Sequence, residues 1–496
     1  MLNMSSMGKA GSSKANVIDV DYNDAKSVPL LRAMVTCGIV AVVYMSGFIS
    51  FSPLLSQFIR KRIAESYTNN PNESFSTGNT CSRNKSNHDN LIGINIQQQS
   101  SDILLYLSLS GSIVSIFINL VFGSYSDFLG RKFLFCIPTL GAVLKGTMLC
   151  LVIAFRFPLG WLYLGYVLEG LTGSFSGYLL AVFAYTADVT EPGKKRTVMI
   201  ALVEGSFAVA GSIGQLAVGF IIHRVNYLYA AIMITAIFGL GLILVITLLP
   251  ETMTNKMEKR WSPMPHIKKV FGFFFTRGSG KQRAMYILAL LIFTFGGFQV
   301  LGRSNVETLY QLDKPFCWSS LKIGYYGAIR LSFSVVSSLV GLKLLQPCFR
   351  DMTIALIGVA FGAASFVMEG LAVNDWMLYL VPVISLLTFA VSPVARSTMS
   401  KMTSPLEQGA LFSSMAAMES ISNALSETMY NTVYHATVDT FGGAVFIVMD
   451  GFGIACAACI IAFLFISREE AQVSESGVVP PAKVELKSLK QGTMTP

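Results

Sequence analysis

Many charged side chains lie inside long apolar stretches of the sequence, where they could hold an ion or a charged ligand. A charge buried in lipid costs roughly 3 kcal/mol or more, so such a residue faces a partner or a water-filled cavity. We therefore expect several of them to bind a substrate or protons rather than only to support a scaffold. They include Lys145, Glu169, Glu204, Arg303, Glu307, Arg330, Arg396, Glu419, Glu427 and Asp450.

The three arginines of this set are the candidate substrate-binding residues. A guanidinium group can hold a carboxylate or phosphate with two parallel hydrogen bonds, and an anionic substrate could bridge Arg330 and Arg396. Arg303 precedes Glu307 by four residues and shares its helix face, so a structural ion pair is an equally good interpretation. For the other two arginines, the alternative is a structural pairing with an acid such as Glu307 or Glu419.

Four carboxylates are the candidate proton-coupling residues: Glu204, Glu307, Glu419 and Asp450. Removal from water favours the protonated form of a carboxyl group, whereas a nearby arginine favours the charged form. A glutamate that alternates between these surroundings therefore binds and releases one proton per cycle. The alternative for Glu204 is a hydrogen bond that only holds helices together.

The elements that must position these side chains are membrane-spanning helices. Hydrophobic residues make up 53% of the 496-residue chain and charged residues only 13%, whereas a soluble domain carries about 25% charged residues. A hydrocarbon layer about 30 Å thick needs around 20 apolar residues per helix, and barrel strands would alternate instead. Twelve segments qualify: 30–55, 102–122, 133–153, 159–185, 197–221, 227–249, 284–308, 321–345, 353–372, 377–398, 410–435 and 442–467.

The basic residues indicate how the chain crosses the membrane. The net charge is +9, but Lys and Arg sit mostly in short connections between apolar runs, so no nucleic-acid partner is expected. With the N-terminus inside, the inner segments hold 23 Lys and Arg and the outer segments hold eight. Both termini are therefore expected in the cytosol. The sequons at Asn72 and Asn84 are expected to be glycosylated in the outer loop 56–101.

A basic connection divides the twelve segments into six and six. Two such halves form repeats about an axis normal to the membrane, with the substrate site between them. The expected organisation is a cytosolic tail at 1–29, a first half at 30–249, a basic cytosolic linker at 250–283, a second half at 284–467 and a disordered cytosolic tail at 468–496.

Other chemistry has little support in this sequence. It has no His/Cys cluster with metal-ligand spacing, no phosphate-binding Gly-Lys-Ser/Thr loop and no nucleophile motif, so no metal, cofactor, ATP-driven step or enzymatic activity is expected. Two of the eight cysteines, Cys81 and Cys317, are expected on the oxidising side of the membrane. They could pair across the two halves or remain free thiols.

The connection between the second and third segments reads Gly123-Ser-Tyr-Ser-Asp127-Phe-Leu-Gly130-Arg131-Lys132. It resembles the signature loop of the major facilitator superfamily. The resemblance implies a role in gating rather than in substrate contact. It also implies an all-α membrane protein with twelve transmembrane helices in two pseudo-symmetric halves.

Further segments resemble one branch of that superfamily, solute carrier family 46. They include the run from Ala201 through Glu204 to Gly211, the run from Thr308 to Trp318, the run from Ser392 to Arg396 and the run from Glu407 to Phe412. The resemblance implies symport of an organic anion with protons. It assigns proton coupling to Glu204, a functional role to Arg396, and a disulfide to Cys81 and Cys317.

The predicted function is therefore secondary active transport by alternating access. The predicted partners are protons, the lipid bilayer and a small organic anion of the folate, steroid-conjugate or cyclic-dinucleotide kind. Two alternatives stay open, a facilitative uniporter and a non-transporting receptor or scaffold with a transporter fold. The plasma membrane is the favoured location, because neither tail carries an acidic dileucine sorting signal, and the endolysosomal membrane is the alternative.

Overall fold

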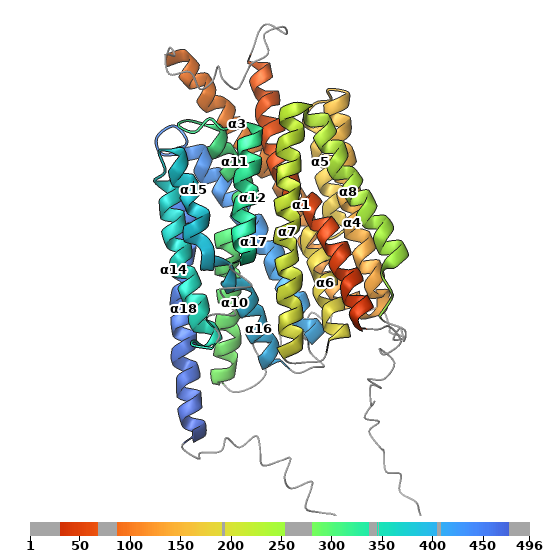
Figure 1. The fold of residues 1–496 in the computed structure, drawn as a ribbon, viewed down its shortest axis with the longest axis vertical. Helices are drawn as coiled ribbons and strands as arrows, with labels where there is room; N and C mark the ends of the chain where they lie inside the picture. Colours follow the sequence, from red (N-terminus) through yellow and green to blue (C-terminus); the bar gives the residue numbers. More distant parts are fainter. Residues whose placement is uncertain are drawn as a thin grey trace, which may run out of the picture.

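The structure is a computed structural model that describes most of the chain between 30 and 475. The described residues are 30–67, 87–190, 194–252, 280–336, 345, 347–403 and 408–475. All regular structure among these residues is helical. The helices stand side by side, and α1 begins at the same face at which α18 ends (Figure 1). We call this the terminal face and the opposite one the distal face.

The first half contains seven described helices. The first three, α1, α3 and α4, are each one continuous helix, and the next span is broken into α5 and α6. The helices are α1 (Leu30–Ser66), α3 (Asn87–Leu129), α4 (Arg131–Ala154), α5 (Trp161–Leu171), α6 (Ser174–Val189), α7 (Lys194–Arg224) and α8 (Tyr227–Leu248). Because 56–66 and 87–101 are helical, the connection expected over 56–101 is shorter than the sequence indicates.

The second half repeats this pattern with more interruptions. Its elements are α10 (Gly280–Val300), α11 (Arg303–Leu312), α12 (Ser320–Val336), α14 (Asp351–Gly370), α15 (Asp375–Ile384), the 3₁₀ helix η3 (Ser385–Ala390), α16 (Val391–Met402), α17 (Gln408–Thr437) and α18 (Ala444–Glu475).

Ten helical stretches of the described chain are long and apolar enough to cross a membrane. Two of the twelve expected spans are not among these ten. The helix α12 is described over 17 residues only, and α17, which carries Glu419 and Glu427, is less apolar. With these two helices the count reaches the expected twelve.

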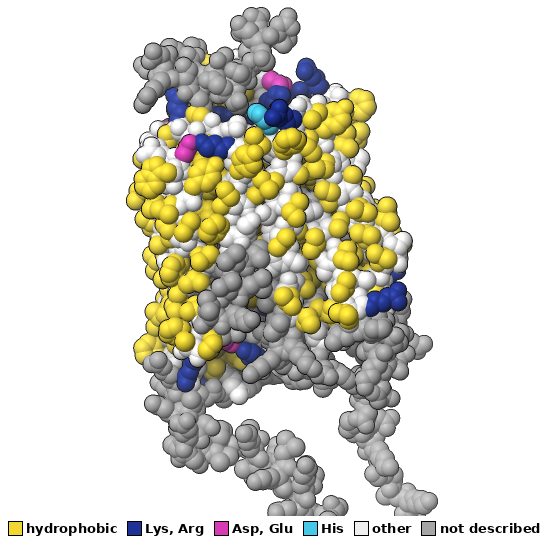
Figure 2. All heavy atoms as spheres, viewed as in Figure 1, with side chains coloured by type: hydrophobic (Ala, Val, Ile, Leu, Met, Phe, Trp, Pro, Cys, Tyr) yellow, Lys and Arg dark blue, Asp and Glu magenta, His cyan; other side chains and the backbone are white. Residues whose placement is uncertain are grey.

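The side of the molecule seen in Figure 2 carries many apolar side chains, while Lys and Arg gather near the two ends. This is the surface expected of a protein surrounded by lipid.

The two halves meet along paired helices. α3 packs against α17, α7 packs against α12, and α1 contacts α11. Figure 1 shows α7 and α12 lying side by side over much of their length. The interface is polar in places, since the Ser212 hydroxyl donates to the Ala328 carbonyl (2.9 Å) and the Asn119 amide donates to the Ser420 hydroxyl (2.9 Å).

Two spans are broken by glycines in the left-handed region. Gly173 (φ 89°) separates α5 from α6, and Gly302 (φ 74°) separates α10 from α11. A Cβ on Gly302 would lie 2.7 Å from the backbone nitrogen of Glu427, so this glycine also permits a close approach of α17. Irregular backbone at membrane depth is tolerated only where protein or a cavity covers it. These breaks therefore mark the place to look for a site.

Candidate functional site

A cavity of about 230 Å³ lies between the two halves, beside both broken spans. Serine hydroxyls and aromatic rings make up much of its wall. The charged residues that line it are Lys145 and Glu169 from the first half, and Arg330 and Glu427 from the second. The cavity therefore presents a cation and an acid from each half, which suits a ligand that contacts both.

Lys145 and Glu169 form a buried ion pair on the first-half wall. The Lys145 ammonium lies 2.7 Å from Oε1 of Glu169, and neither side chain is more than 6% exposed. The same ammonium lies 4.4 Å from the ring centre of Phe51. The sequence marks both residues as charges inside spans, but only the structure places them at the cavity, because 24 residues separate them along the chain.

Arg330 is the predicted substrate-binding arginine that lines this cavity. Its Nη2 lies 3.3 Å from Oε2 of Glu307, and its side chain is 13% exposed. The remaining acid of the wall, Glu427, receives a long hydrogen bond from the Asn423 amide (3.4 Å). A guanidinium with one acidic partner keeps donors available for a carboxylate or sulfate group.

Arg303 lies behind this wall in an ion-pair network. Its guanidinium lies 3.3 Å from Oε1 of Glu307 and also pairs with Glu369 of α14. The expected pairing of Arg303 with Glu307 is present, and Glu369 is a partner that the sequence does not reveal. Glu307 thus links Arg303 to Arg330, and a change in either cation acts on the other through it.

A second charged cluster joins α7 of the first half to the second half. Nη1 of Arg396 lies 3.3 Å from Oε1 of Glu204, and its Nη2 lies 3.1 Å from Oε1 of Glu419. The guanidinium also stacks on the ring of Phe183, at 4.2 Å from its centre. Arg396 and Glu419 border a separate hollow of about 10 Å³. Arg330 and Arg396 therefore line different hollows in this conformation.

Asp450 stands apart from both clusters. It lies on α18, half-buried, and its Oδ1 has no hydrogen-bond partner among the described residues. It does not border the described cavities near Arg330 and Arg396. A role of Asp450 in proton coupling stays a prediction.

The expected gating loop is mostly helical, because 123–129 continue α3 and only Gly130 interrupts the helix before α4, at the terminal face. Gly130 (φ 89°, ψ 151°) joins α3 to α4, and the Arg131 guanidinium lies 2.6 Å from Oδ2 of Asp188. Oε1 of Glu251 accepts from the backbone nitrogen of Arg131 (2.8 Å), and its Oε2 accepts from that of Lys132 (3.2 Å). Glu251 thus caps α4 from the end of the first half, a contact that sequence spacing could not reveal.

Several predicted residues fall outside this description. Gly123 and Asp127 lie in the part of α3 whose side chains are not described, and Asn72, Asn84 and Cys81 lie outside the described residues. Cys317 is disulfide-bonded. Its pairing with Cys81 stays a prediction, as does glycosylation of the two asparagines.

Comparison with known proteins places this architecture in a family. Residues 36–427 match the major facilitator superfamily. The lysosomal proton-coupled steroid conjugate and bile acid symporter of Gallus gallus is 30% identical over 85% of this chain and 91% of its own length. The chain belongs to the major facilitator superfamily and, within it, to solute carrier family 46.

Other relatives agree with the assignment of this chain to solute carrier family 46. The proton-coupled folate transporter of Bos taurus is 29% identical over 74% of this chain and 80% of its own. Among solved structures, a human organic anion transporter superposes with a TM-score of 0.61 at 16% identity, covering 87% of this chain and 100% of that one. The nucleoside transporter NupG gives 0.59 at 12% identity, covering 87% and 99%. The expected family and fold class are confirmed.

Proposed function

We propose that this family 46 member is a secondary active transporter that carries an organic anion together with protons by alternating access. The observation that carries the proposal is the contact between Glu204 of the first half and Arg396 of the second, 3.3 Å apart. An acid–base pair across the two moving halves connects the charge of a carboxyl group to the conformation of the protein. The relatives named above are symporters and transporters described as proton-coupled.

Protonation of Glu204 provides the coupling step in this proposal. The neutral carboxylic acid no longer attracts the guanidinium of Arg396, which then keeps Glu419 as its acidic partner. The link between α7 and α16 weakens, and the halves can separate on that side. Release of the proton to the less acidic side restores the pair, so proton movement and rocking of the halves occur in one cycle.

The anion binds between the halves in the central cavity. Arg330 and Lys145 provide the positive charge, one from each half, and the cavity wall includes Phe48 and Phe175, whose rings stack at 4.2 Å. Cations beside aromatic rings favour an anion with a large apolar or planar body. Steroid conjugates, bile acids and folates, the compounds in the relatives' names, share this chemistry.

The topology and location complete the proposal. Both termini lie in the cytosol, so the distal face is extracellular or luminal. We retain the plasma membrane as the favoured location, and the endolysosomal membrane is the alternative that relatives described as lysosomal support. Surface biotinylation of intact cells, with and without permeabilisation, separates the two locations.

Transport by the purified full chain in liposomes tests the proposal. We expect counterflow of at least one labelled anion among a bile acid, a steroid sulfate and a folate, and accumulation that requires a proton gradient and is abolished by a protonophore. Uptake that ignores the gradient would identify a uniporter instead. The absence of counterflow for every anion would identify a receptor or scaffold and contradict the proposal.

A further inference from the structure

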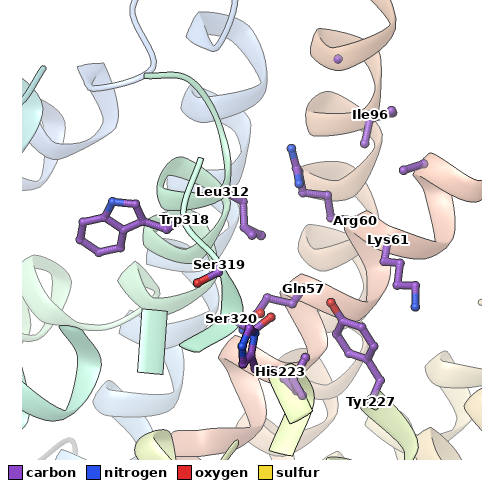
Figure 3. A pocket seen from close by; sticks show the side chains of 13 residues that line it. Gln57, Arg60, Lys61, Ile96, His223, Tyr227, Leu312, Trp318, Ser319 and Ser320 are labelled. Atoms are coloured by element: carbon purple, nitrogen blue, oxygen red, sulfur yellow. The ribbon is translucent and has the colours of Figure 1, made fainter. Parts of the chain in front are cut away.

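A second cavity opens near the distal face, separate from the central one. It has a volume of about 270 Å³, and both halves contribute to its wall. Figure 3 shows Arg60, Lys61 and Tyr227 on one side of the hollow and Leu312 with Trp318 on the other. Its wall also includes the side chains of Gln57, His223, Ser319 and Ser320.

The charge of this cavity is unbalanced. Arg60 and Lys61 line it, and none of the described lining residues is acidic. Arg60 is 7% exposed, and its Nε has no hydrogen-bond partner among the described residues. A buried guanidinium without a close acidic partner is costly, so a site of this kind gains from an anion that fills it.

No nearby acid forms an ion pair with Arg60 in the described part of the chain. Asp313 acts on it electrostatically, but no ion pair of 4 Å or less joins them in the described part of the chain. Burial raises the pKa of the Asp313 carboxyl, although a backbone hydrogen bond with Lys314 and the charge of Arg60 oppose that shift. Glu65 lies at the rim, 3.9 Å from the Lys61 ammonium and 3.8 Å from the Arg62 guanidinium, and it is not among the lining residues.

The distal cavity is separated from the central one by polar contacts. Ser52 lines the central cavity and Gln57 the distal one, five residues apart on α1, or about 8 Å along the helix axis. Between them the Ser56 hydroxyl donates to Asn305 of α11 (3.2 Å). The Gln97 amide of α3 donates to the Leu309 carbonyl (3.3 Å). An anion in the distal cavity is thus held outside a closed contact between the halves.

We propose that the distal cavity is a second anion-binding site, in which Arg60 and Lys61 hold a carboxylate, sulfate or phosphate group. The aromatic and apolar walls exclude water from the bound group and strengthen its attraction to the two cations. The site does not depend on the proposed transport activity, because it exists in the conformation in which the contacts between it and the central cavity are closed.

Equilibrium binding of radiolabelled inorganic sulfate to the purified full chain in detergent tests this site. We expect saturable binding, and we expect Arg60→Gln to weaken it at least tenfold. Arg62→Gln is the matched control, because it removes one charge from the same helix turn while its guanidinium donates outside the cavity, to the Arg156 carbonyl (2.8 Å). Arg330→Gln reports on sulfate held in the central cavity and should leave the Arg60-dependent binding unchanged.

A second variant keeps the test decisive if Arg60→Gln does not fold. Ser320→Asp places a negative charge at the cavity wall and should abolish sulfate binding at the distal cavity, whereas Ser66→Asp at the end of α1 should not. Wild-type protein that binds no sulfate overturns the proposal. So does an Arg60→Gln or Ser320→Asp protein that is folded, by its elution and melting profile, and binds sulfate like the wild type.

Discussion

The Arg396 guanidinium lies between two glutamates that belong to different halves of the molecule. Its Nη1 is 3.3 Å from Glu204 of α7, and its Nη2 is 3.1 Å from Glu419 of α17. Loss of the charge on Glu204 breaks the contact between halves, whereas loss of the charge on Glu419 breaks a contact within the second half. The two acids therefore have different effects on rocking of the halves, although they share one cation.

This relationship predicts the behaviour of Glu204→Gln. Glutamine resembles a permanently protonated glutamate, so the variant should cycle without binding and releasing a proton. We expect its uptake to be equal at acidic and neutral outer pH, whereas wild-type uptake increases as the outer pH falls. Counterflow, which needs no net proton movement, should persist.

Glu65→Gln is the control for that experiment, because Glu65 is 41% exposed and its ion pairs with described residues are the long ones with Lys61 and Arg62. It should retain acid stimulation. If Glu204→Gln also retains it, Glu204 is not the coupling residue.

Arg330→Gln should weaken substrate binding. Hydrogen bonds to charged groups contribute about 1.5–3 kcal/mol, and each 1.4 kcal/mol corresponds to about tenfold in affinity. We expect the KM for a transported anion to rise at least tenfold while the protein reaches the membrane in normal amount. The exposed Arg350, at the start of α14, is the control. A KM for Arg330→Gln within twofold of wild type would remove Arg330 from the binding site.

The buried pair of Lys145 and Glu169 should show strong energetic coupling. Removing one partner of a buried ion pair leaves an unpaired charge and costs about 3–5 kcal/mol. Lys145→Met should therefore lower the melting temperature in detergent sharply, and the double variant Lys145→Met/Glu169→Gln should recover most of the loss.

Lys401 provides the comparison for Lys145. Its ammonium pairs with Asp351 at the same distance, 2.7 Å, but the lysine is 54% exposed. Exposed pairs contribute at most about 1 kcal/mol, so Lys401→Met should change the melting temperature little. Equal effects of the two lysine variants would show that burial does not strengthen the Lys145 pair.

Gly130→Ala tests the turn of the gating loop. The dihedral angles φ 89° and ψ 151° belong to a region that only glycine occupies readily, and forcing another residue there costs about 1–3 kcal/mol. The new Cβ would also lie 2.7 Å from Oε2 of Glu251, which caps α4. We expect a lower melting temperature and lower transport. Gly239→Ala in α8, where nothing lies within 4 Å of a new Cβ, should leave both unchanged.

Thiol counting tests the predicted disulfide. The chain has eight cysteines, of which six are free and Cys317 is bonded. Denatured, unreduced protein should therefore take up six maleimide-polyethylene glycol groups, and reduced protein eight. Cys81→Ser should raise the unreduced count to seven by freeing Cys317. An unchanged count of six in that variant would contradict the Cys81–Cys317 pairing.

The sequence by itself determined the number of spans, their division into halves and the family. Each of these properties is encoded locally, since a lipid-spanning helix needs only a long apolar run, and the loop from Gly123 to Lys132 is contiguous. It also identified every charged residue of the central cavity as a charge inside a span, because such residues stand out against an apolar background.

Only the tertiary structure decided which of these charges meet. Arg396 and Glu204 are 192 positions apart, and Arg303 and Glu369 are 66 apart, so neither pairing follows from helix periodicity. Likewise, Arg60 falls in the outer connection that the sequence predicts over 56–101, yet it is buried beside a cavity. The physical reason is that an ion pair depends on the direction of two side chains across a helix interface, and that direction is set by the packing of whole helices.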